Sequence, residues 1–313
     1  MTTSSPPQSG MPTTCDFSVV HPPAPHLGGM TQALAISGRL VRIVRKRSEA
    51  FEPLEDPEAC LGELREKRVR ADLFTFSQRV SELEPRFGYH CESEPVAILK
   101  IHTYEKWWKE TVNDKTRNMV RKAGKKRVRV EVVPYTDELV HGIKQIYDEC
   151  PIRQGKKSRH FGKSFERIKA EHGTFLERSE FIGAYIDNRL IGFAKVVFQP
   201  DFASIMNFIS LLSERDKAPN NALMAKVVDR CTLKGIGILH YGVWGHRGFA
   251  EFKVHNGFRC QNVLRFYVPL TARGQLALRL GWHRPLVNHI PEPVLDWLAT
   301  ARSKWFAWRY PIR

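Results

Sequence analysis

Residues 180–270 constrain the fold most, because strand-like and helix-like patterns follow one another there in a fixed order. Two apolar runs flank Asp187 and Asn188, residue types that tolerate the positive φ angles of a two-residue hairpin turn. The pattern continues with a third strand, a helix, a strand, a short helix and a last strand. The predicted elements are residues 181–186, 190–198, Ala203–Ser210, 220–234, Ile238–Val243, a short helix ending near 252, and 263–269.

The same alternation begins upstream of the hairpin. Residues 128–133 alternate apolar and polar side chains as a strand does. Thr136 is placed as the N-cap of a helix that runs to about residue 150. A basic loop over residues 151–162 and a second helix over 163–175 follow. Together these patterns predict one α/β domain over residues 128–270.

The flanking segments have weaker patterns. Residues 1–34 are rich in Pro, Ser, Thr and Gly, which predicts a disordered tail. Residues 35–127 are predicted to form a partial N-terminal α/β region that ends in a basic helix over 104–126. Residues 271–313 are expected to be a C-terminal helical extension interrupted by prolines. The strands and helix expected in the N-terminal region are residues 40–44, 56–66, 73–77 and 96–101, with no topology implied.

Positive charge is concentrated in two segments. The chain has 49 Lys and Arg against 33 Asp and Glu, which gives a formal net charge of +16. Residues 115–129 hold eight basic side chains and no acid, and residues 153–163 hold five and no acid. Charge gathered in this way indicates an anionic partner, such as tRNA or another nucleic acid, an anionic membrane surface or a phosphorylated substrate. A solvated basic face remains the alternative interpretation.

Several classes of protein are disfavoured by the sequence. There is no apolar run of about 18 residues, and the N-terminus lacks the pattern of a secretory signal. The six cysteines are scattered, which argues against a zinc site and fits reduced thiols. We therefore expect a cytoplasmic protein without a metal. The basic, tryptophan-containing C-terminus leaves peripheral contact with an anionic membrane as a further alternative.

Five short segments of the chain carry a family resemblance: residues 117–123, 185–192, 219–223, 234–236 and 252–258. They resemble the GNAT acyltransferase superfamily, and within it the Fem-type peptidyl-transferases and their acetyltransferase-like relatives. The resemblance implies a mixed, mostly antiparallel sheet flanked by helices, an α/β (α+β) fold. Fem-type proteins usually carry two such domains and often a helical arm, whereas the region before residue 128 is too short for a full second copy.

The resemblance implies where an acyl donor would bind. It would lie in a cleft between the strands Ala203–Ser210 and Ile238–Val243, with its phosphates at the start of the helix near residue 220. The loop before that helix contains no glycine, unlike the loop of ordinary acetyl-CoA enzymes. An ordinary capped helix start is the alternative. The residues expected to contact the donor are Asn207, Ser210, Arg215, Lys217, Asn220 and Asn221, with Asn220 or Asn221 capping the helix.

The resemblance also implies an acceptor site and candidate proton-transfer groups. The basic loop would border the acceptor, although a mobile solvated loop is the alternative. Gly257 is expected to end a helix and Phe258 to pack. The expected acceptor contacts are Arg153, Gln154, Lys156, Arg159, His160, Trp244 and Lys253, and the candidate catalytic groups are Tyr241, His240 and His246.

The function predicted from these features is N-acyl transfer. An acyl group would pass from acyl-CoA, foremost acetyl-CoA, to an amine acceptor that is anionic or related to an envelope or polysaccharide precursor. The amine would attack directly, and backbone N–H groups would stabilise the oxyanion. Two alternatives remain open: a Fem-type transferase that uses aminoacyl-tRNA, and a non-catalytic GNAT-like protein that binds nucleic acid.

Overall fold

The computed structural model describes residues 34–153, 156–245 and 248–284, together with Val294, Trp297, Thr300, Ala301 and Trp305. The predicted disordered tail therefore lies outside the described residues, except for Leu34. Most of the predicted C-terminal extension beyond residue 284 also lies outside them. None of the helices in the described ranges has the length and hydropathy needed to cross a membrane.

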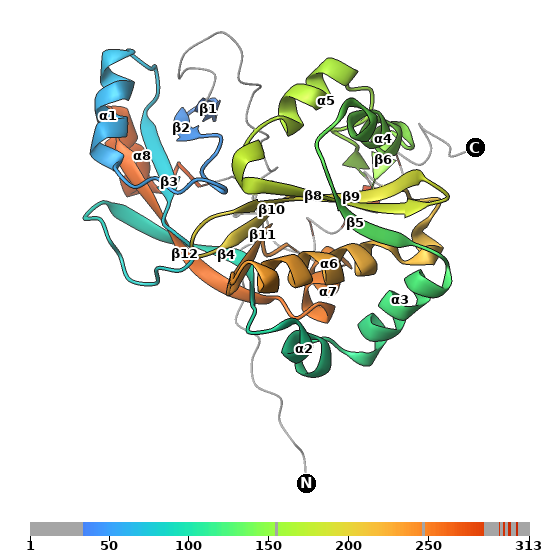
Figure 1. The fold of residues 1–313 in the computed structure, drawn as a ribbon. Coiled ribbons are helices and arrows are strands. Elements are labelled where there is room, and N and C mark those ends of the chain that lie inside the picture. Colours follow the sequence, from blue (N-terminus) through green and yellow to red (C-terminus); the bar gives the residue numbers. More distant parts are fainter. Residues whose placement is uncertain are drawn as a thin grey trace.

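A ten-stranded sheet forms the centre of the molecule (Figure 1). Two neighbouring pairs, β2–β3 and β10–β11, are parallel, and the others are antiparallel. The predicted mixed, mostly antiparallel sheet is thus confirmed. In spatial order the strands are β1 (Leu34–Ser37), β2 (Ile43–Lys46), β3 (Leu73–Ser77), β12 (Arg259–Pro269), β4 (His90–Lys100), β11 (Ile238–Val243), β10 (Ala203–Ser210), β9 (Arg189–Phe198), β8 (Ser179–Ile186) and β5 (Arg129–Val133).

Helices cover both faces of this sheet (Figure 1). The pair α4 (Asp137–Asp148) and α5 (Phe165–His172) lies on one face. The other face carries α6 (Pro219–Leu233), α7 (Gly248–His255) and α3 (Asp114–Lys125). The other helices of the described ranges are α1 (Pro57–Glu66), α2 (Tyr104–Lys106) and α8 (Ala272–Leu280), and β6 (Ile152–Arg153) pairs with β7 (Lys156–Lys157) in a separate two-stranded antiparallel sheet.

Strand β4 joins the N-terminal region to the rest of the sheet. It lies between β11 and β12, and Ile98 is the register partner of both His240 and Arg259. Residues 96–99 of β4 are buried on both faces, as expected for a central strand. Strands from both sides of residues 127 and 128 share one sheet, so the sheet does not mark a boundary there. The division of the chain at this point stays a prediction.

Several turns and caps that short sequence patterns predicted are present in the structure. Asp187 and Asn188 adopt positive φ angles of 46° and 64° in the β8–β9 hairpin. The Thr136 hydroxyl accepts a hydrogen bond from the backbone N–H of Leu139 and caps α4, as predicted. Gly257 has a φ of 88°, and a Cβ there would lie 2.1 Å from the Cγ2 of Thr111, so a side chain would clash.

The continuous helix predicted over residues 104–126 was wrong. The chain forms α2, a π-helical turn over Trp107–Thr111 and then, after an extended Val112, the separate helix α3. Asn113 starts α3, because its side-chain oxygen accepts a hydrogen bond from the backbone N–H of Thr116 at 2.8 Å. The helical periodicity continues across this break and therefore could not reveal it.

Candidate functional site

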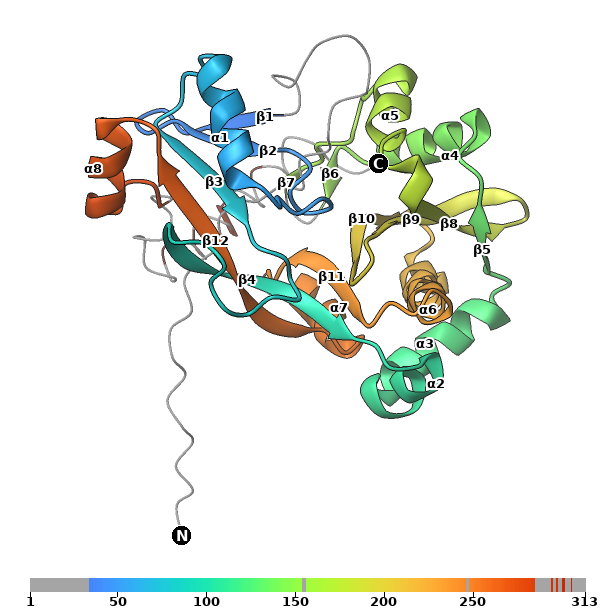
Figure 2. The same cartoon turned by 60° about the vertical axis from the view of Figure 1, so that its left-hand side comes forward.

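Strands β10 and β11 separate from each other after a short paired segment. They pair only through Ala203 with Leu239 and Ser204 with His240. Beyond these positions β10 continues to Ser210 and β11 to Val243 without further pairing, and the register shifts on the outer side of each strand. The two strands therefore diverge towards their C-terminal ends, which can be followed in Figure 2. We call this divergence the splay.

Helix α6 begins at the open end of β10. Its N-cap is Ala218, in a left-handed conformation, and no side chain caps it. The predicted capping by Asn220 or Asn221 was therefore wrong: Pro219 at the first helical position already fixes the helix start. The Oδ1 of Asn220 is buried and has no hydrogen-bond partner.

The loop between β10 and α6 is held by an internal carboxylate. Glu149, just after α4, accepts hydrogen bonds from the backbone N–H groups of Leu212 (2.7 Å) and Ser213 (2.9 Å), and from the Ser213 hydroxyl. Burial raises the pKa of Glu149. The hydrogen bonds and the charge of Arg153 lower it by a larger amount, so the pKa of Glu149 lies below the usual value. The carboxylate thus occupies two backbone donors next to the helix start at which the resemblance placed the donor's phosphates.

The two cations predicted to meet the donor phosphates differ in their surroundings. Lys217 forms an ion pair with Glu214, which also pairs with Arg189. Arg215 is exposed. Because Glu214 is itself buried, this corner carries an anion as well as cations.

His240 is a buried histidine beside the splay. It is 7% exposed, and its Nδ1 lies 3.1 Å from the Ser204 hydroxyl oxygen. That hydroxyl also lies 2.9 Å from the carbonyl oxygen of Ala50, to which it donates. Since a hydroxyl has one hydrogen, it must accept from Nδ1, which places the ring proton on Nδ1. The Nε2 atom then carries a lone pair, and it has no hydrogen-bond partner.

The protonation state of His240 follows from its surroundings. Burial, with a further contribution from the charge of Lys253, lowers its pKa to about 4. The imidazole is therefore neutral near pH 7. Lys253 is fully buried on α7, and burial lowers its pKa to about 7.

A cavity of about 100 Å³ adjoins His240. Gly242 and Val243, which lie on β11 beyond the last β10–β11 pair, also line it. Arg265 in its wall is 6% exposed, and its guanidinium lies between two carboxylates, Glu49 at 3.0 Å and Glu94 at 2.9 Å. Other charged residues of the lining are Arg45, Arg47 and Arg79.

The comparisons with known proteins support the fold. No protein-family model and no curated protein matches the chain. Among solved structures, FemX is similar with a TM-score of 0.54 at 12% identity, over 79% of this chain and 85% of that one. L-PGS from Bacillus licheniformis is similar with a TM-score of 0.50 at 13% identity, over 82% and 84%. The chain has a GNAT-like fold. At these identities the likeness extends to the fold alone.

In GNAT terms the splay is where the resemblance placed the acyl donor. His240 and Tyr241 lie on opposite faces of β11, because side chains alternate along a strand. Tyr241 packs against Phe208 and Phe258, and burial raises the pKa of its hydroxyl, which stays protonated. Gln154 and His246 lie outside the described residues.

The predicted acceptor loop is only partly a surface loop. Arg153 donates to the carbonyl oxygens of Ser210 and Ile146 and pairs with Glu149, so it connects the end of α4 to the end of β10. Lys156 lies in β7, and Arg159 is exposed. The structure thus gives Arg153 a supporting position rather than a place in an open pocket.

A buried polar group beside this loop combines the predicted residues His160 and Asn207 with Tyr147 and His172, which the sequence did not indicate. Tyr147 stacks on His160 with ring centroids 4.3 Å apart, and its hydroxyl lies 3.0 Å from His172 Nε2. Asn207, predicted to contact the donor, instead donates to the Tyr147 hydroxyl at 3.3 Å. The backbone N–H of Trp244 donates to the carbonyl oxygen of Pro95. Nothing in the spacing of Tyr147 and His172 along α4 and α5 marked them out.

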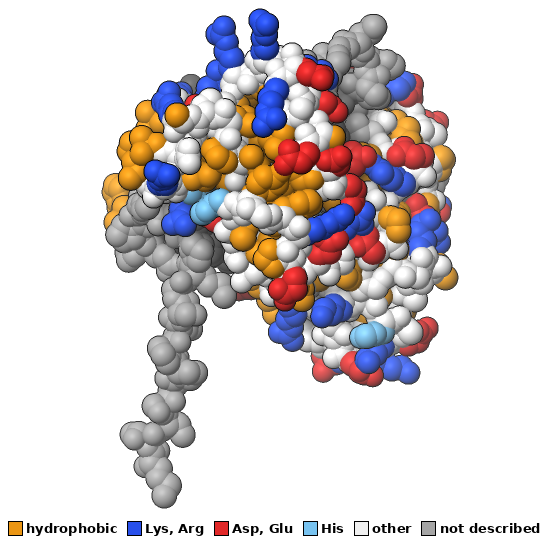
Figure 3. Space-filling model, turned by 90° about the vertical axis from the view of Figure 1, so that its left-hand side faces the viewer, with side chains coloured by type: hydrophobic (Ala, Val, Ile, Leu, Met, Phe, Trp, Pro, Cys, Tyr) orange, Lys and Arg blue, Asp and Glu red, His pale blue; other side chains and the backbone are white. Residues whose placement is uncertain are grey.

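The basic segment also divides into two kinds of residue. The Arg117 guanidinium donates to three backbone carbonyls, those of Trp108, Lys109 and Val112, so it stabilises the turn before α3. Exposed basic side chains remain at Lys115, Arg121, Lys125, Lys126 and Arg127. On the face shown in Figure 3, by contrast, basic and acidic side chains are interspersed around a group of apolar ones.

Proposed function

We propose that this protein is an acyltransferase that holds an activated acyl group in the splay and an amine acceptor in the adjoining cavity. The observation that carries the proposal is the buried Nε2 atom of His240, which has no hydrogen-bond partner and belongs to a residue that lines the cavity. An acceptor amine can donate a hydrogen bond to this nitrogen. Arginine and glutamate side chains both line the cavity, which suits an acceptor with an acidic group besides its amine.

The reaction needs only modest basicity from His240. The amine nitrogen attacks the carbonyl carbon, an N–C bond forms, and the bond from that carbon to the leaving oxygen or sulfur breaks. The nitrogen becomes strongly acidic as its new bond forms, so an imidazole with a pKa of about 4 can take its proton. The leaving group takes up a proton in turn. Backbone N–H groups where β10 and β11 separate are the candidate donors to the oxyanion.

Two donors are compatible with this arrangement, and we favour aminoacyl-tRNA over acyl-CoA. Glu149 already takes the backbone donors of Leu212 and Ser213, and the loop has no glycine to open a second approach. The exposed basic side chains of α3 suit a polyanion. Acyl-CoA remains the second candidate, because the start of α6 has no side-chain cap.

A transfer assay with both donors tests the proposal. The purified chain is incubated with labelled acetyl-CoA or with labelled aminoacyl-tRNA and a set of amino-group acceptors. His240→Gln, which preserves a polar side chain, is the matched control. We expect the transfer of label from aminoacyl-tRNA to the acceptor to be slower with His240→Gln than with the wild type, by a factor of about 10² or more. We also expect no thermal shift with CoA.

Other outcomes of the assay would be informative. A saturable thermal shift with CoA that persists as salt rises would replace tRNA with acyl-CoA as the donor. Transfer that is unchanged in His240→Gln would remove His240 from the chemistry. Salt-sensitive binding of uncharged tRNA, with no transfer from either donor, would favour a binding protein without catalysis.

A further inference from the structure

Three potential metal ligands meet at the end of β4 farthest from the splay. His90 and Glu92 are two residues apart on this strand and so share one face. His283 belongs to the turn after α8, where Gly281 ends the helix with a φ of 70°. The chain separation between His283 and Glu92 is 191 residues, so only the fold brings them together.

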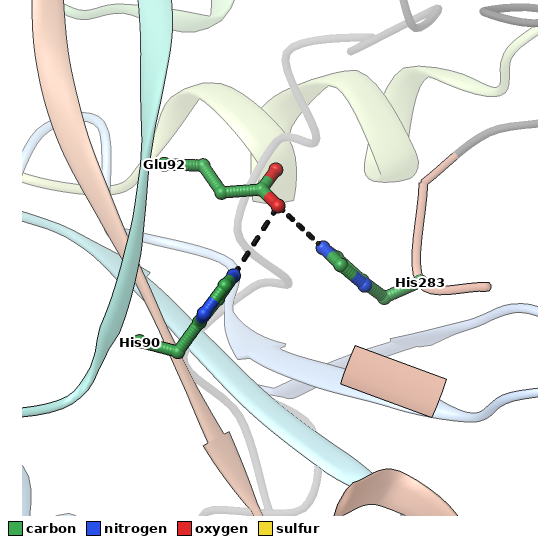
Figure 4. Close-up of side chains that lie close together, drawn as sticks. All are labelled: His90, Glu92 and His283. Atoms are coloured by element: carbon green, nitrogen blue, oxygen red, sulfur yellow. Dashed lines mark hydrogen bonds and ion pairs between the residues drawn. The ribbon is translucent and has the colours of Figure 1, made fainter. Parts of the chain in front are cut away.

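The side chains converge on one carboxylate oxygen (Figure 4). The Nε2 atoms of His283 and His90 lie 2.8 Å and 3.3 Å from Glu92 Oε1. One ligand atom from each residue lies within 4.8 Å of the other two. In a tetrahedral zinc site with bonds of about 2.1 Å, ligand atoms are roughly 3.4 Å apart. Small side-chain movements, chiefly of the exposed His90, would reach that geometry.

His283 is also held from its other side. Its ring is almost completely buried, and Nδ1 faces the carbonyl oxygen of Ala277 at 3.5 Å. Metal-binding histidines usually donate their second ring nitrogen to such a carbonyl, which directs the other nitrogen to the metal. With its proton on Nδ1, His283 would present a lone pair to the Glu92 carboxylate. The lone pairs of His283 Nε2 and Glu92 Oε1 would then repel each other unless a cation, either a proton or a metal ion, lay between them.

We propose that His90, Glu92 and His283 form a binding site for a divalent transition-metal ion, foremost Zn²⁺. Two imidazoles and one carboxylate suit zinc and leave a fourth position for water. The ion joins β4 to the turn after α8 and so fastens the start of the C-terminal segment to the sheet. This role is structural and independent of the proposed acyl transfer.

Arg284 gives the proposal a sharp test, because it competes with the ion. Its Nε and one terminal nitrogen lie 3.1 Å and 3.0 Å from the same Glu92 oxygen, and its side chain is 52% exposed. A bound ion would repel this guanidinium, which can turn into solvent. Replacing Arg284 with Gln should therefore strengthen metal binding, whereas the ligand substitutions should weaken it.

The experiment is a titration of the full chain with Zn²⁺ alone, after chelator treatment and without a polyhistidine tag. We expect one ion per chain and a rise in Tm on saturation. His283→Asn and Glu92→Gln should each weaken binding about tenfold or more, and Arg284→Gln should tighten it about threefold. Co²⁺ should give the visible absorption of a tetrahedral site in the wild type but not in His283→Asn or Glu92→Gln.

The exposed thiol of Cys91 lies between two of the ligands in sequence and needs its own control. Cys91→Ser should bind zinc as the wild type does. If Cys91→Ser abolishes binding, or if Glu92→Gln and His283→Asn bind zinc as tightly as the wild type, the proposal is wrong. Weaker binding by Arg284→Gln would also overturn it, because the guanidinium would then be a supporting group. If His283→Asn does not fold, Glu92→Gln alone provides the test of the ligands.

Discussion

The loop after β10 and the cavity lined by β11 adjoin the two strands of the splay, yet their polar groups are arranged in opposite ways. In the loop, Glu149 accepts from two backbone N–H groups, and Glu214 pairs with Lys217 and Arg189. In the cavity, His240 keeps a buried nitrogen without a partner. A buried polar group that the protein leaves unsatisfied is costly, and a ligand can satisfy it. We infer that the loop is a supporting structure and that the cavity is the place for chemistry.

The largest effect is expected from Glu149→Ala. The substitution removes the acceptor of two backbone donors and leaves Arg153, whose side chain is 16% exposed, without its carboxylate. Breaking a largely buried pair of this kind costs about 3 to 4 kcal/mol. Urea unfolding measures the change in the free energy of unfolding. Glu149→Gln, which retains one acceptor oxygen, is the matched control and should lose less.

Glu149→Ala also tests the inference that the loop is a supporting structure and the cavity is the place for chemistry. If Glu149 blocks a phosphate position, Glu149→Ala should gain affinity for CoA in a thermal-shift titration. A variant that loses little stability, and gains no CoA binding, would contradict the interpretation of the loop as internally satisfied.

The next effect concerns the dependence of stability on pH. The folded-state pKa of His240 is about 4, below the ordinary value of about 6.5 in an unfolded chain. Between these two values the unfolded chain binds more protons, so stability must fall as pH is lowered from about 6.5 to about 4. The full loss is on the order of 3 kcal/mol.

His240→Gln tests this expectation, since glutamine does not titrate. The free energy of unfolding of the variant should change less than that of the wild type between the two pH values. Above pH 7 the two curves should run parallel. Identical slopes below pH 6.5 would mean that folding does not lower the pKa of His240, and the interpretation of its surroundings as desolvating would be wrong.

The sequence predicted the local parts of this molecule and missed the parts that depend on distant contacts. The bounds of β10 and β11 were predicted correctly, because alternation and flanking turns mark a strand from within. The position of β4 between β11 and β12 was not predicted, since its partners lie more than a hundred residues away.

The candidate site divides in the same way. His240 was identified because it is a titratable residue on a strand of the expected cleft. Ser204, 36 residues away, and Glu149, which acts on the loop 63 and 64 residues later, were missed. No short-range pattern connects these residues, and their effect comes from hydrogen bonds that exist only in the folded chain.

A smaller effect is expected from Ser204→Ala. The hydroxyl lies within hydrogen-bond distance of His240 Nδ1, and in the proposed mechanism it orients that ring without contacting the acceptor, so Ser204 is a positioning residue. Without it either ring nitrogen can carry the proton, and the fraction with a free Nε2 lone pair falls. We expect transfer to slow by about tenfold or less, compared with about 10²-fold or more for His240→Gln. A loss as large as that of His240→Gln would mean that the hydroxyl itself contacts substrate; the ratio of kcat to KM, measured for both variants, separates these cases.

The smallest effect on stability is expected from replacing Arg121, Lys125 and Lys126 together by Gln, because these side chains are exposed. The free energy of unfolding should change by no more than about 0.5 kcal/mol per site. Binding of tRNA should weaken and depend less steeply on salt. Arg117→Gln is the contrasting control: it removes hydrogen bonds to three carbonyls, so it should lower stability while leaving the salt dependence almost unchanged. The opposite pattern would show that Arg117 faces the polyanion, and would remove the distinction between supporting and available charges on which the choice of donor rests.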